Sequence, residues 1–357
     1  CGIAGMGLSS LLQAYLGRAG NMPQVKSSRQ DRCELPASAL GGDRPAMVSG
    51  HGIDYLAAAL EDAIGVKAVQ TSEPLARHTA LRVGGPADLL VTARSAEVLR
   101  RSVVLAWEYE IPCRVLGGGS NILVSDQGVR GMVILNRARA TEFTPGRVRA
   151  ESGTYFSTLA QRCIMGGQGG LEWAVGIPGT VGGAVVGNAG AWGSDVSSTL
   201  IQATVLEKNG RSNVWPVAQF GYGYRTSTLK EQVAEYGHRA VVLDAEFALI
   251  PAEAAALRKR ANTITARRKE SQPPGATCGS VFKNPADDYA GRLIDQAGLK
   301  GRRCGGAQIS PLHANFVVNL GQATAADIKS LIDLVQAEVL DQFGLALETE
   351  IEFIGEW

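Results

Sequence analysis

The chain has 357 residues, of which 45% are hydrophobic, and its 35 basic and 34 acidic residues leave a formal net charge of +1. This length can bury the cores of roughly two or three domains, and the near-neutral charge predicts neither a nucleic-acid partner nor an acidic membrane partner. No apolar run reaches membrane-spanning length, and no basic stretch with an apolar core marks a leader at the start. We therefore expect a cytoplasmic protein, and a monomer.

The cysteines are scattered and form no Cys-x-x-Cys pair, and only four histidines accompany them. This pattern predicts free thiols in a reducing compartment and no metal site. The six cysteines are Cys1, Cys33, Cys113, Cys163, Cys278 and Cys304.

Residues 1–65 are predicted to be an N-terminal extension of unknown role, with a short helix over residues 55–64 that ends at Gly65. The opening Cys1-Gly2-Ile3-Ala4-Gly5 resembles the start of class II glutamine amidotransferases, in which an N-terminal cysteine thiol attacks glutamine. That nucleophile needs a large surrounding domain, and none is recognisable before the glycine-rich motifs begin. The alternatives to an amidotransferase start are that the chain is a fragment or a processed product, or that the extension is the remnant of a fusion partner and acts as an interaction segment.

Short strands punctuated by glycine alternate irregularly with helices through the first two thirds of the chain. The strands are predicted at residues 89–91, 113–116, 122–124, 131–135, 147–151 and 203–207. The helices are predicted from Ser95, as N-cap, through residue 109 and at residues 157–165. This order predicts an α+β fold, and the absence of a Gly-x-Gly-x-x-Gly that opens a helix after a strand disfavours a Rossmann domain.

Two glycine-rich runs stand out. Seven glycines lie between Gly176 and Gly193, and Gly117-Gly118-Gly119-Ser120-Asn121 directly follows the strand at residues 113–116. Glycine loses the most backbone entropy on folding, so such density indicates sharply turning backbone whose amides another group can approach. Two main-chain cradles of this kind favour a phosphate-bearing dinucleotide, and the alternative is a tight all-β crossover without a ligand.

The last third of the chain is richer in long helices. A helix over residues 253–270 is ended by Pro273-Pro274-Gly275. The elements expected after it are a helix at 290–297, a turn at 305–306, a strand at 315–320, a helix at 325–343 with Thr324 as cap and Gly344 as stop, and a strand at 347–354.

Three polar side chains are candidates for chemistry, each with a plain structural alternative. Arg225 follows Tyr224, and could hold a carboxylate with two hydrogen bonds or stack on that ring at the surface. Ser280 follows a glycine in a proline-bounded segment and is either a proton donor or a turn serine that bonds backbone. Glu350 alternates with apolar neighbours, as a glutamate on the wet face of an edge strand would.

Taken together, five motifs between Leu75 and Gly355 resemble those of the bacterial UDP-N-acetylenolpyruvoylglucosamine reductase family, flavoenzymes of peptidoglycan precursor synthesis. The motifs are Gly117-Gly118-Gly119-Ser120-Asn121, Gly176-Ile177-Pro178-Gly179 with Asn188-Ala189-Gly190-Ala191, Tyr224-Arg225, Gly279-Ser280-Val281-Phe282-Lys283-Asn284-Pro285, and Glu350-Ile351-Glu352-Phe353-Ile354-Gly355.

This resemblance implies an FAD-binding fold of the p-cresol methylhydroxylase/vanillyl-alcohol oxidase type over residues 66–247 and a substrate-binding α+β domain over residues 248–357. The FAD would be held without a covalent bond. The cofactor-binding positions carried over are Arg82, Gly117, Gly118, Gly119, Ser120, Asn121, Ile177, Pro178, Gly179, Gly182, Gly183, Asn188, Ala189 and Gly190.

The resemblance also implies the reaction. NADPH would reduce FAD and leave, and UDP-N-acetylglucosamine enolpyruvate would then receive hydride at C3 and become UDP-N-acetylmuramate. Ser280 would protonate C2, while Arg225 and Glu350 would polarise the carboxylate. The substrate-binding positions implied are Lys283, Asn284 and His313.

Two departures from the family pattern matter. Ser271 falls where the family often has a lysine for the substrate diphosphate, so Lys269 or other donors would have to serve there. The short spacing from Asn284 to Gly291 indicates the shorter branch of the family, in which His313 either contacts substrate or is a packed surface histidine. A flavin oxidase with a covalently held flavin is the rival enzyme class, and the Ser280 and Glu350 motifs argue against it.

Overall fold

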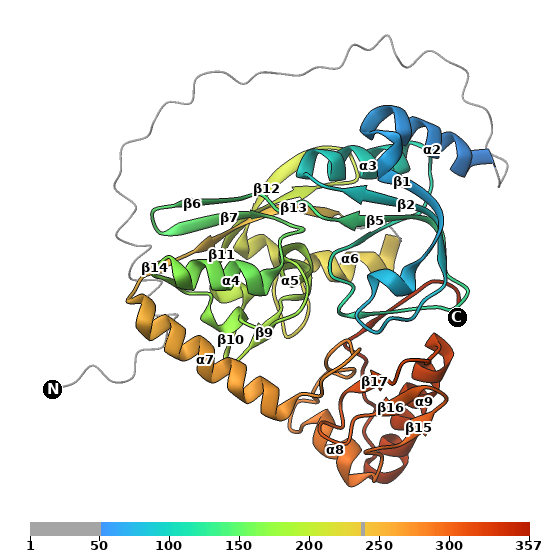
Figure 1. Ribbon diagram of the computed structural model, residues 1–357, viewed down its shortest axis with the longest axis vertical. Helices are drawn as coiled ribbons and strands as arrows, with labels where there is room; N and C mark the ends of the chain where they lie inside the picture. The colour runs from blue at the N-terminus through green and yellow to red at the C-terminus, as the bar shows by residue number, and fades with distance from the viewer. Residues whose placement is uncertain (1–50, 237–239) are drawn as a thin grey trace.

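The computed structural model describes residues 51–236 and 240–357 and mixes helices with several small sheets, as the predicted α+β class requires (Figure 1). Cys1, and with it the amidotransferase-like start, lies outside the described residues. The described part of the N-terminal extension is helix α2 (His51–Ile64), which ends where predicted because Gly65 takes a φ of 93°. Among the helices that the structure describes, none is long and apolar enough to cross a membrane.

The first sheet has the strand order β1-β2-β5-β3, with β2, β5 and β3 parallel and β1 antiparallel at the edge. Helices α2 and α3 (Ala96–Glu108) cover one face of it, and the Ser95 hydroxyl caps α3 by accepting a hydrogen bond from the Val98 amide, as predicted. The strands are β1 (Val69–Pro74), β2 (Pro86–Ala93), β3 (Cys113–Leu116) and β5 (Val129–Asn136).

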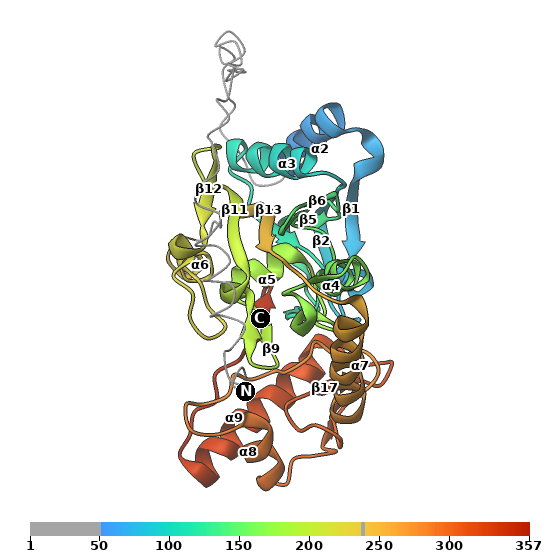
Figure 2. The ribbon, with the colours of Figure 1, turned by 90° about the vertical axis from the view of Figure 1, so that its left-hand side faces the viewer.

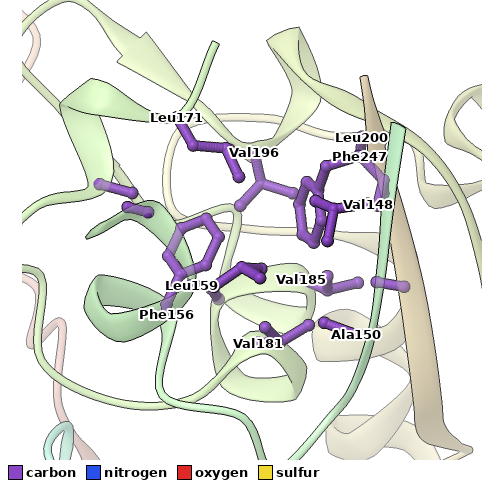
Figure 3. Packing of buried hydrophobic residues seen from close by; sticks show 14 of the residues in the cluster. Val148, Ala150, Phe156, Leu159, Leu171, Val181, Val185, Val196, Leu200 and Phe247 are labelled. Atoms are coloured by element: carbon purple, nitrogen blue, oxygen red, sulfur yellow. The ribbon is translucent and has the colours of Figure 1, made fainter. Parts of the chain in front are cut away.

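The second sheet is antiparallel, in the order β12-β11-β13-β7-β6. Helices α4 (Phe156–Met165) and α5 (Val181–Gly187) pack against it, and their shared core is built around Phe156 and Phe247, whose ring centroids are 5.6 Å apart (Figure 3). Truncating a phenylalanine as buried as these costs about 3–5 kcal/mol. The strands are β6 (Thr141–Thr144), β7 (Arg147–Glu151), β11 (Leu200–Leu206), β12 (Ser212–Pro216) and β13 (Val241–Ala248).

Shorter elements complete this part of the chain. The small pairs β9–β10 and β8–β14 and helix α6 (Thr228–Tyr236) lie around the second sheet. The short strands are β8 (Gln168–Gly169), β9 (Gly190–Ala191), β10 (Ser194–Asp195) and β14 (Ile250–Pro251). The 3-10 turns are η3 (Val66–Ala68), η4 (Leu75–His78), η5 (Glu172–Ala174), η6 (Val196–Ser198) and η7 (Val217–Phe220).

The long helix α7 (Ala254–Ser271) leads from the second sheet to a separate C-terminal lobe (Figures 1 and 2). Helix α9 (Ala325–Phe343) begins with a capping box between Thr324 and Asp327 and ends at Gly344, so its predicted bounds are confirmed. The lobe also contains α8 (Ala290–Gln296), β15 (Arg303–Cys304), β16 (Ala307–Ile309) and β17 (Val317–Asn319).

Beyond α9 the chain returns to the first half of the molecule. The last strand, β18 (Glu352–Ile354), pairs in parallel with β4 (Ile122–Val124), which follows the first glycine-rich run. The predicted strand over residues 347–354 is therefore too long. A second correction concerns the run from Gly176 to Gly193: its centre is helix α5 rather than turning backbone, because Val181, Ala184 and Val185 share one buried face.

Candidate active site

A cavity of about 770 Å³ lies where five distant parts of the chain meet. It is lined by both glycine-rich runs, by the loop that carries Arg225, by residues 277–280 and by Glu350. Arg225, Ser280 and Glu350, which are far apart in the sequence, thus face one space together with all seven predicted cofactor-binding glycines.

The first glycine-rich run lines this cavity over its whole length, Gly117 to Asn121. Side chains would not fit here: a Cβ on Gly117 would lie 2.2 Å from the Thr180 hydroxyl oxygen, and one on Gly119 2.2 Å from the His78 carbonyl oxygen. Among the described residues, no acceptor takes a hydrogen bond from the amides of Gly118, Gly119 or Ser120. Orphaned amides beside a cavity are what an anionic ligand requires, so these residues fit a pyrophosphate.

The second run supplies the facing wall. Gly176 and Gly179 have φ angles of 77° and 103°, which only glycine adopts without strain. A Cβ on Gly182 would lie 2.9 Å from the Ser152 Cβ, so this glycine lets α5 approach the second sheet. The predicted positions of this run that line the cavity are Ile177, Pro178, Gly179, Gly182, Gly183, Ala189 and Gly190.

Two predicted cofactor-binding residues do not line the cavity. Asn188 is the left-handed C-cap of α5, and its buried side chain donates to the Gly223 carbonyl at 3.0 Å and accepts from the Ser197 amide at 3.1 Å. It therefore holds the turn between α5 and the Arg225 loop. Arg82 is exposed, with a φ of 57°, and lies outside the lining.

The guanidinium of Arg225 makes an ion pair with Glu350, with 2.8 Å between Nε and Oε1. Its Nη2 donates to the Gly190 carbonyl at 2.8 Å, and its guanidinium also lies 5.2 Å from the centre of the exposed Tyr224 ring. The arginine therefore stacks on Tyr224, as one alternative from the sequence predicted, and it also lines the cavity. Its bidentate contact with a substrate carboxylate stays a prediction.

The backbone holds Arg225 in a strained conformation. Its φ of 58° is left-handed, which costs a non-glycine residue on the order of 1–3 kcal/mol. The Lys230 ammonium donates to the Arg225 carbonyl at 3.0 Å, and the Ser227 hydroxyl ties the loop to Val186 of α5 at 2.6 Å. Such strain persists only where the surroundings fix it, and here it aims the guanidinium at Glu350.

Ser280 and Glu350 lie on neighbouring extended segments. The Glu350 amide donates to the Val281 carbonyl at 2.7 Å, and Ser280 forms a bridge with Phe316 on its other side. No hydrogen bond to the Ser280 hydroxyl is found in the part of the chain that the structure describes, although this residue lines the cavity. It is not the turn serine of the alternative interpretation, and its hydroxyl is available to a ligand.

Asn121 connects the first glycine-rich run to the catalytic candidates. Its side-chain amide donates to the Glu350 carbonyl at 3.1 Å, and its own carbonyl accepts from the Glu352 amide at 3.0 Å. The parallel pairing of β4 with β18 continues this contact. The loop that could hold a phosphate is therefore fixed by hydrogen bonds to the segment that carries Glu350.

Comparison with known proteins relates this geometry to a family. A family model described as the C-terminal domain of UDP-N-acetylenolpyruvoylglucosamine reductase matches residues 270–354, and one described as an FAD binding domain matches residues 87–212. The chain is 43% identical over 290 residues to the UDP-N-acetylenolpyruvoylglucosamine reductase of Chloroflexus aggregans, which is 80% of this chain and 97% of that relative. The chain belongs to the UDP-N-acetylenolpyruvoylglucosamine reductase family.

Other members of the reductase family agree. The reductase of Moorella thermoacetica is 44% identical over 310 residues, with 85% of this chain and 99% of that relative covered. The crystal structure of the reductase from Thermus caldophilus matches with a TM-score of 0.69 at 36% identity and covers 80% of this chain and 98% of that chain. These matches confirm the predicted fold, an FAD-binding part followed by a C-terminal reductase domain.

The substrate positions that the family resemblance implied lie outside the cavity lining. Lys283 is ion-paired with Glu348, and the Asn284 side chain accepts from the Ala290 amide at 3.1 Å, at the start of α8. The His313 ring packs against Phe316, with 4.7 Å between centroids, and burial lowers the pKa of this histidine. Phe316 itself lines the cavity, so His313 lies one residue behind it.

Sequence reasoning missed two cations that this reductase family member places in the cavity, Arg268 and Lys230. A Cβ on Gly176 would lie 3.0 Å from the Arg268 Cδ, so that glycine makes room for the arginine, whose pKa burial lowers. Neither Lys269 nor Ser271 lines the cavity, and the Ser271 hydroxyl donates to the Arg267 carbonyl at 2.8 Å. The irregular spacing of basic residues along α7 gave no signal as to which one points inward.

Proposed function

We propose that this chain reduces the enolpyruvyl group of UDP-N-acetylglucosamine enolpyruvate to the lactyl ether of UDP-N-acetylmuramate, with NADPH as the reductant and bound FAD as the carrier. This is a step of peptidoglycan precursor synthesis. The observation that carries the proposal is a free serine hydroxyl and an arginine–glutamate pair in the same cavity as two glycine-rich cradles.

The glycine-rich runs supply the cofactor site. The unpaired amides of Gly118, Gly119 and Ser120 would hold the FAD pyrophosphate without a covalent bond, and Ile177-Pro178-Gly179 would face it from the other wall of the cavity. When bound, FAD supplies hydride transfer, from NADPH and then to C3 of the substrate. Residues 66–247 carry this site and Arg225, and residues 248–357 bring Ser280 and Glu350, which with Arg225 meet the sugar nucleotide.

Ser280 delivers the proton that completes the reduction. Addition of hydride at C3 leaves negative charge at C2, next to the substrate carboxylate. A proton must then be added to C2 to complete the reduction. The Ser280 hydroxyl has no hydrogen bond with a described residue, so it is free to point at C2. A positioned general acid of this kind contributes about 10²–10⁴-fold to the rate.

Arg225 and Glu350 handle the charge that develops on the carboxylate. The Nε and Nη2 atoms of Arg225 are engaged by Glu350 and by the Gly190 carbonyl, which fixes the guanidinium plane. The Nη1 atom has no hydrogen-bond partner among the described residues and is left for a substrate oxygen. A donor fixed before the reaction stabilises the charged intermediate without having to reorganise.

The identity of the product tests the proposal. We expect anaerobic incubation with NADPH and UDP-N-acetylglucosamine enolpyruvate to give a product heavier by two hydrogen atoms, detected by mass spectrometry, with one NADPH consumed for each. A product that forms only in the presence of oxygen, or no product from a FAD-loaded protein, would favour the oxidase alternative.

We also propose that the protein acts as a monomer in the cytoplasm, where NADPH and nucleotide sugars are made. Light scattering after size-exclusion chromatography and cell fractionation test the two parts separately. A dimer peak would remove the first part, and recovery with the envelope fraction the second.

A further inference from the structure

Arg137 lies directly behind the first glycine-rich run and outside the main cavity. It follows β5 at the carboxyl edge of the parallel strands, next to the loop that follows β3. Its Nη1 donates to the Gly117 carbonyl at 2.6 Å and to the Asn136 carbonyl at 3.2 Å. Its side chain faces a second, shallower hollow, whose lining residues are His78, Thr92, Arg94, Leu135, Arg137 and Arg139.

The planarity of the peptide bond links Arg137 to the amide of Gly118. The bond between Gly117 and Gly118 is trans, as are all the described peptide bonds, so its C=O and N–H groups point in opposite directions. With the carbonyl held on the side of Arg137, the Gly118 N–H is turned to the other side, where Gly118 lines the main cavity. That N–H has no acceptor among the described residues.

We propose that Arg137 is a positioning residue for the FAD pyrophosphate, because it fixes the Gly117–Gly118 peptide with its N–H facing the cavity. The inference rests on the proposed function and adds a residue to it. A peptide between two glycines can flip at little steric cost, since neither residue has a side chain that favours one orientation. The charged hydrogen bond from Arg137 to the Gly117 carbonyl disfavours the flipped peptide, so the N–H already faces the cavity before FAD binds.

The surroundings of Arg137 favour a role on these carbonyls over a salt bridge. Burial lowers its pKa, and the positive charges of Arg139 and Arg94 lower it further. No carboxylate within the described ranges forms an ion pair with Arg137. The Asn136 side chain, which accepts from the Ala138 amide at 3.1 Å and donates to Ser152 at 2.8 Å, gives the arginine a rigid base.

A neighbouring arginine provides a matched control. Arg139 lines the same hollow and carries the same charge, but its guanidinium lies 4.5 Å from the centre of the Tyr155 ring and has no hydrogen bond to Gly117. Arg139→Gln therefore changes the electrostatic field near the loop and leaves the peptide contact in place. Arg137→Gln and Arg137→Ala remove that contact, and Arg137→Lys keeps a charged donor.

The experiment is titration of FAD into flavin-free protein, followed by fluorescence quenching. We expect the FAD Kd to rise at least about tenfold in Arg137→Ala, with partial recovery in Arg137→Lys and a change of less than about threefold in Arg139→Gln. The phosphorus resonances of bound FAD should shift in the Arg137 variants, while the rate of flavin reduction at saturating FAD stays within about twofold of wild type.

Equal losses in Arg137→Gln and Arg139→Gln, both reduced by added salt, would show that only the electrostatic field matters and would overturn the inference. An unchanged FAD Kd in Arg137→Ala would do the same. If the alanine variant does not fold, the lysine and glutamine variants, checked by circular dichroism, decide the question. A wild-type protein that binds no FAD would overturn the proposed function first, so the two failures are distinguishable.

Discussion

The Ser280 hydroxyl is required in only one half of the proposed reaction, and this asymmetry makes it testable. Ser280→Ala should leave reduction of the flavin by NADPH within about twofold of wild type and slow flavin reoxidation by the enolpyruvyl substrate by about 10²–10⁴-fold. The measurement is anaerobic stopped-flow absorbance of each half-reaction. Ser271→Ala, at an exposed serine whose hydroxyl bonds only the Arg267 carbonyl, is the control. Equal losses in both half-reactions would contradict the role of proton donor.

Arg225 depends on its planar fork, which lysine lacks. Arg225→Lys removes either the contact to Glu350 or the one to Gly190, and we expect kcat to fall by about 10²–10³-fold in steady-state assays. Arg149→Lys, which changes an exposed pair with Asp244 on the second sheet, should leave kcat unchanged. A kcat within threefold of wild type for Arg225→Lys would show that the fork is not used.

At the scale of single residues, the sequence predicted which polar side chains meet better than it predicted the packing around them, and their chemical roles stay predictions. Arg225, Ser280 and Glu350 were recognised from their motifs and do share a cavity. Asn188, in contrast, stands in a ligand-like motif but uses its polar atoms on the Gly223 carbonyl and the Ser197 amide of this protein's own backbone. Arg268 went unnoticed because its direction depends on how α7 docks, which no local pattern reveals.

For the first glycine-rich run, the structure predicts a steric limit. Gly117→Ala would place a Cβ 2.2 Å from the Thr180 hydroxyl oxygen, so the two loops would have to separate, at a cost of about 1–3 kcal/mol. We expect a lower melting temperature of the flavin-free protein and weaker FAD binding, measured by calorimetry and by fluorescence titration. Gly166→Ala, at the end of α4 where a Cβ would meet nothing closer than 3.5 Å, is the control and should change neither.

At the scale of helices and strands, some elements can be predicted from local sequence patterns alone. Thr324 and Gly344 carry the two end signals of α9, and the apolar spacing between them is strong, so the helix was predicted to the residue. Helix α5 was not predicted because its three glycines disfavour a helix in the local sequence, whereas its apolar residues stabilise the helix by packing against the second sheet. The end of the chain was predicted as one long strand, whereas β18 is limited to the three residues that pair with β4.

At the scale of the whole molecule, His313 makes stability depend on pH. Burial, with a smaller contribution from the Lys300 charge, lowers its pKa below the ordinary value of 6.5 in the folded state. The unfolded chain therefore binds a proton that the folded chain does not, and this contribution to stability is complete above pH 6.5 and is lost as the pH falls through the folded pKa. His313→Gln should flatten the fall in melting temperature between about pH 7 and pH 5. A slope as steep as that of wild type would contradict this.

The cavity itself belongs to this largest scale. It exists because β18 returns from the C-terminal lobe to β4, and because Asn121 bonds the backbone of Glu350 across 229 positions of sequence. Contacts between residues so far apart produce no periodic pattern in the sequence. The site residues could therefore be identified only from their motifs, and the sequence could not predict which residues line the cavity. Lys283, Asn284 and His313, like Arg82 and Asn188, are positions that were predicted to bind a ligand and do not line the cavity.

The most direct test of the proposed reaction is a sequential-mixing stopped-flow experiment on the FAD-loaded protein without oxygen. NADPH is added first, and UDP-N-acetylglucosamine enolpyruvate follows once the flavin absorbance has bleached. We predict that the oxidised flavin spectrum returns on the second addition, with one substrate consumed per flavin. Recovery that requires oxygen, or a bleached flavin that the enolpyruvyl substrate leaves unchanged, would contradict the proposed reaction.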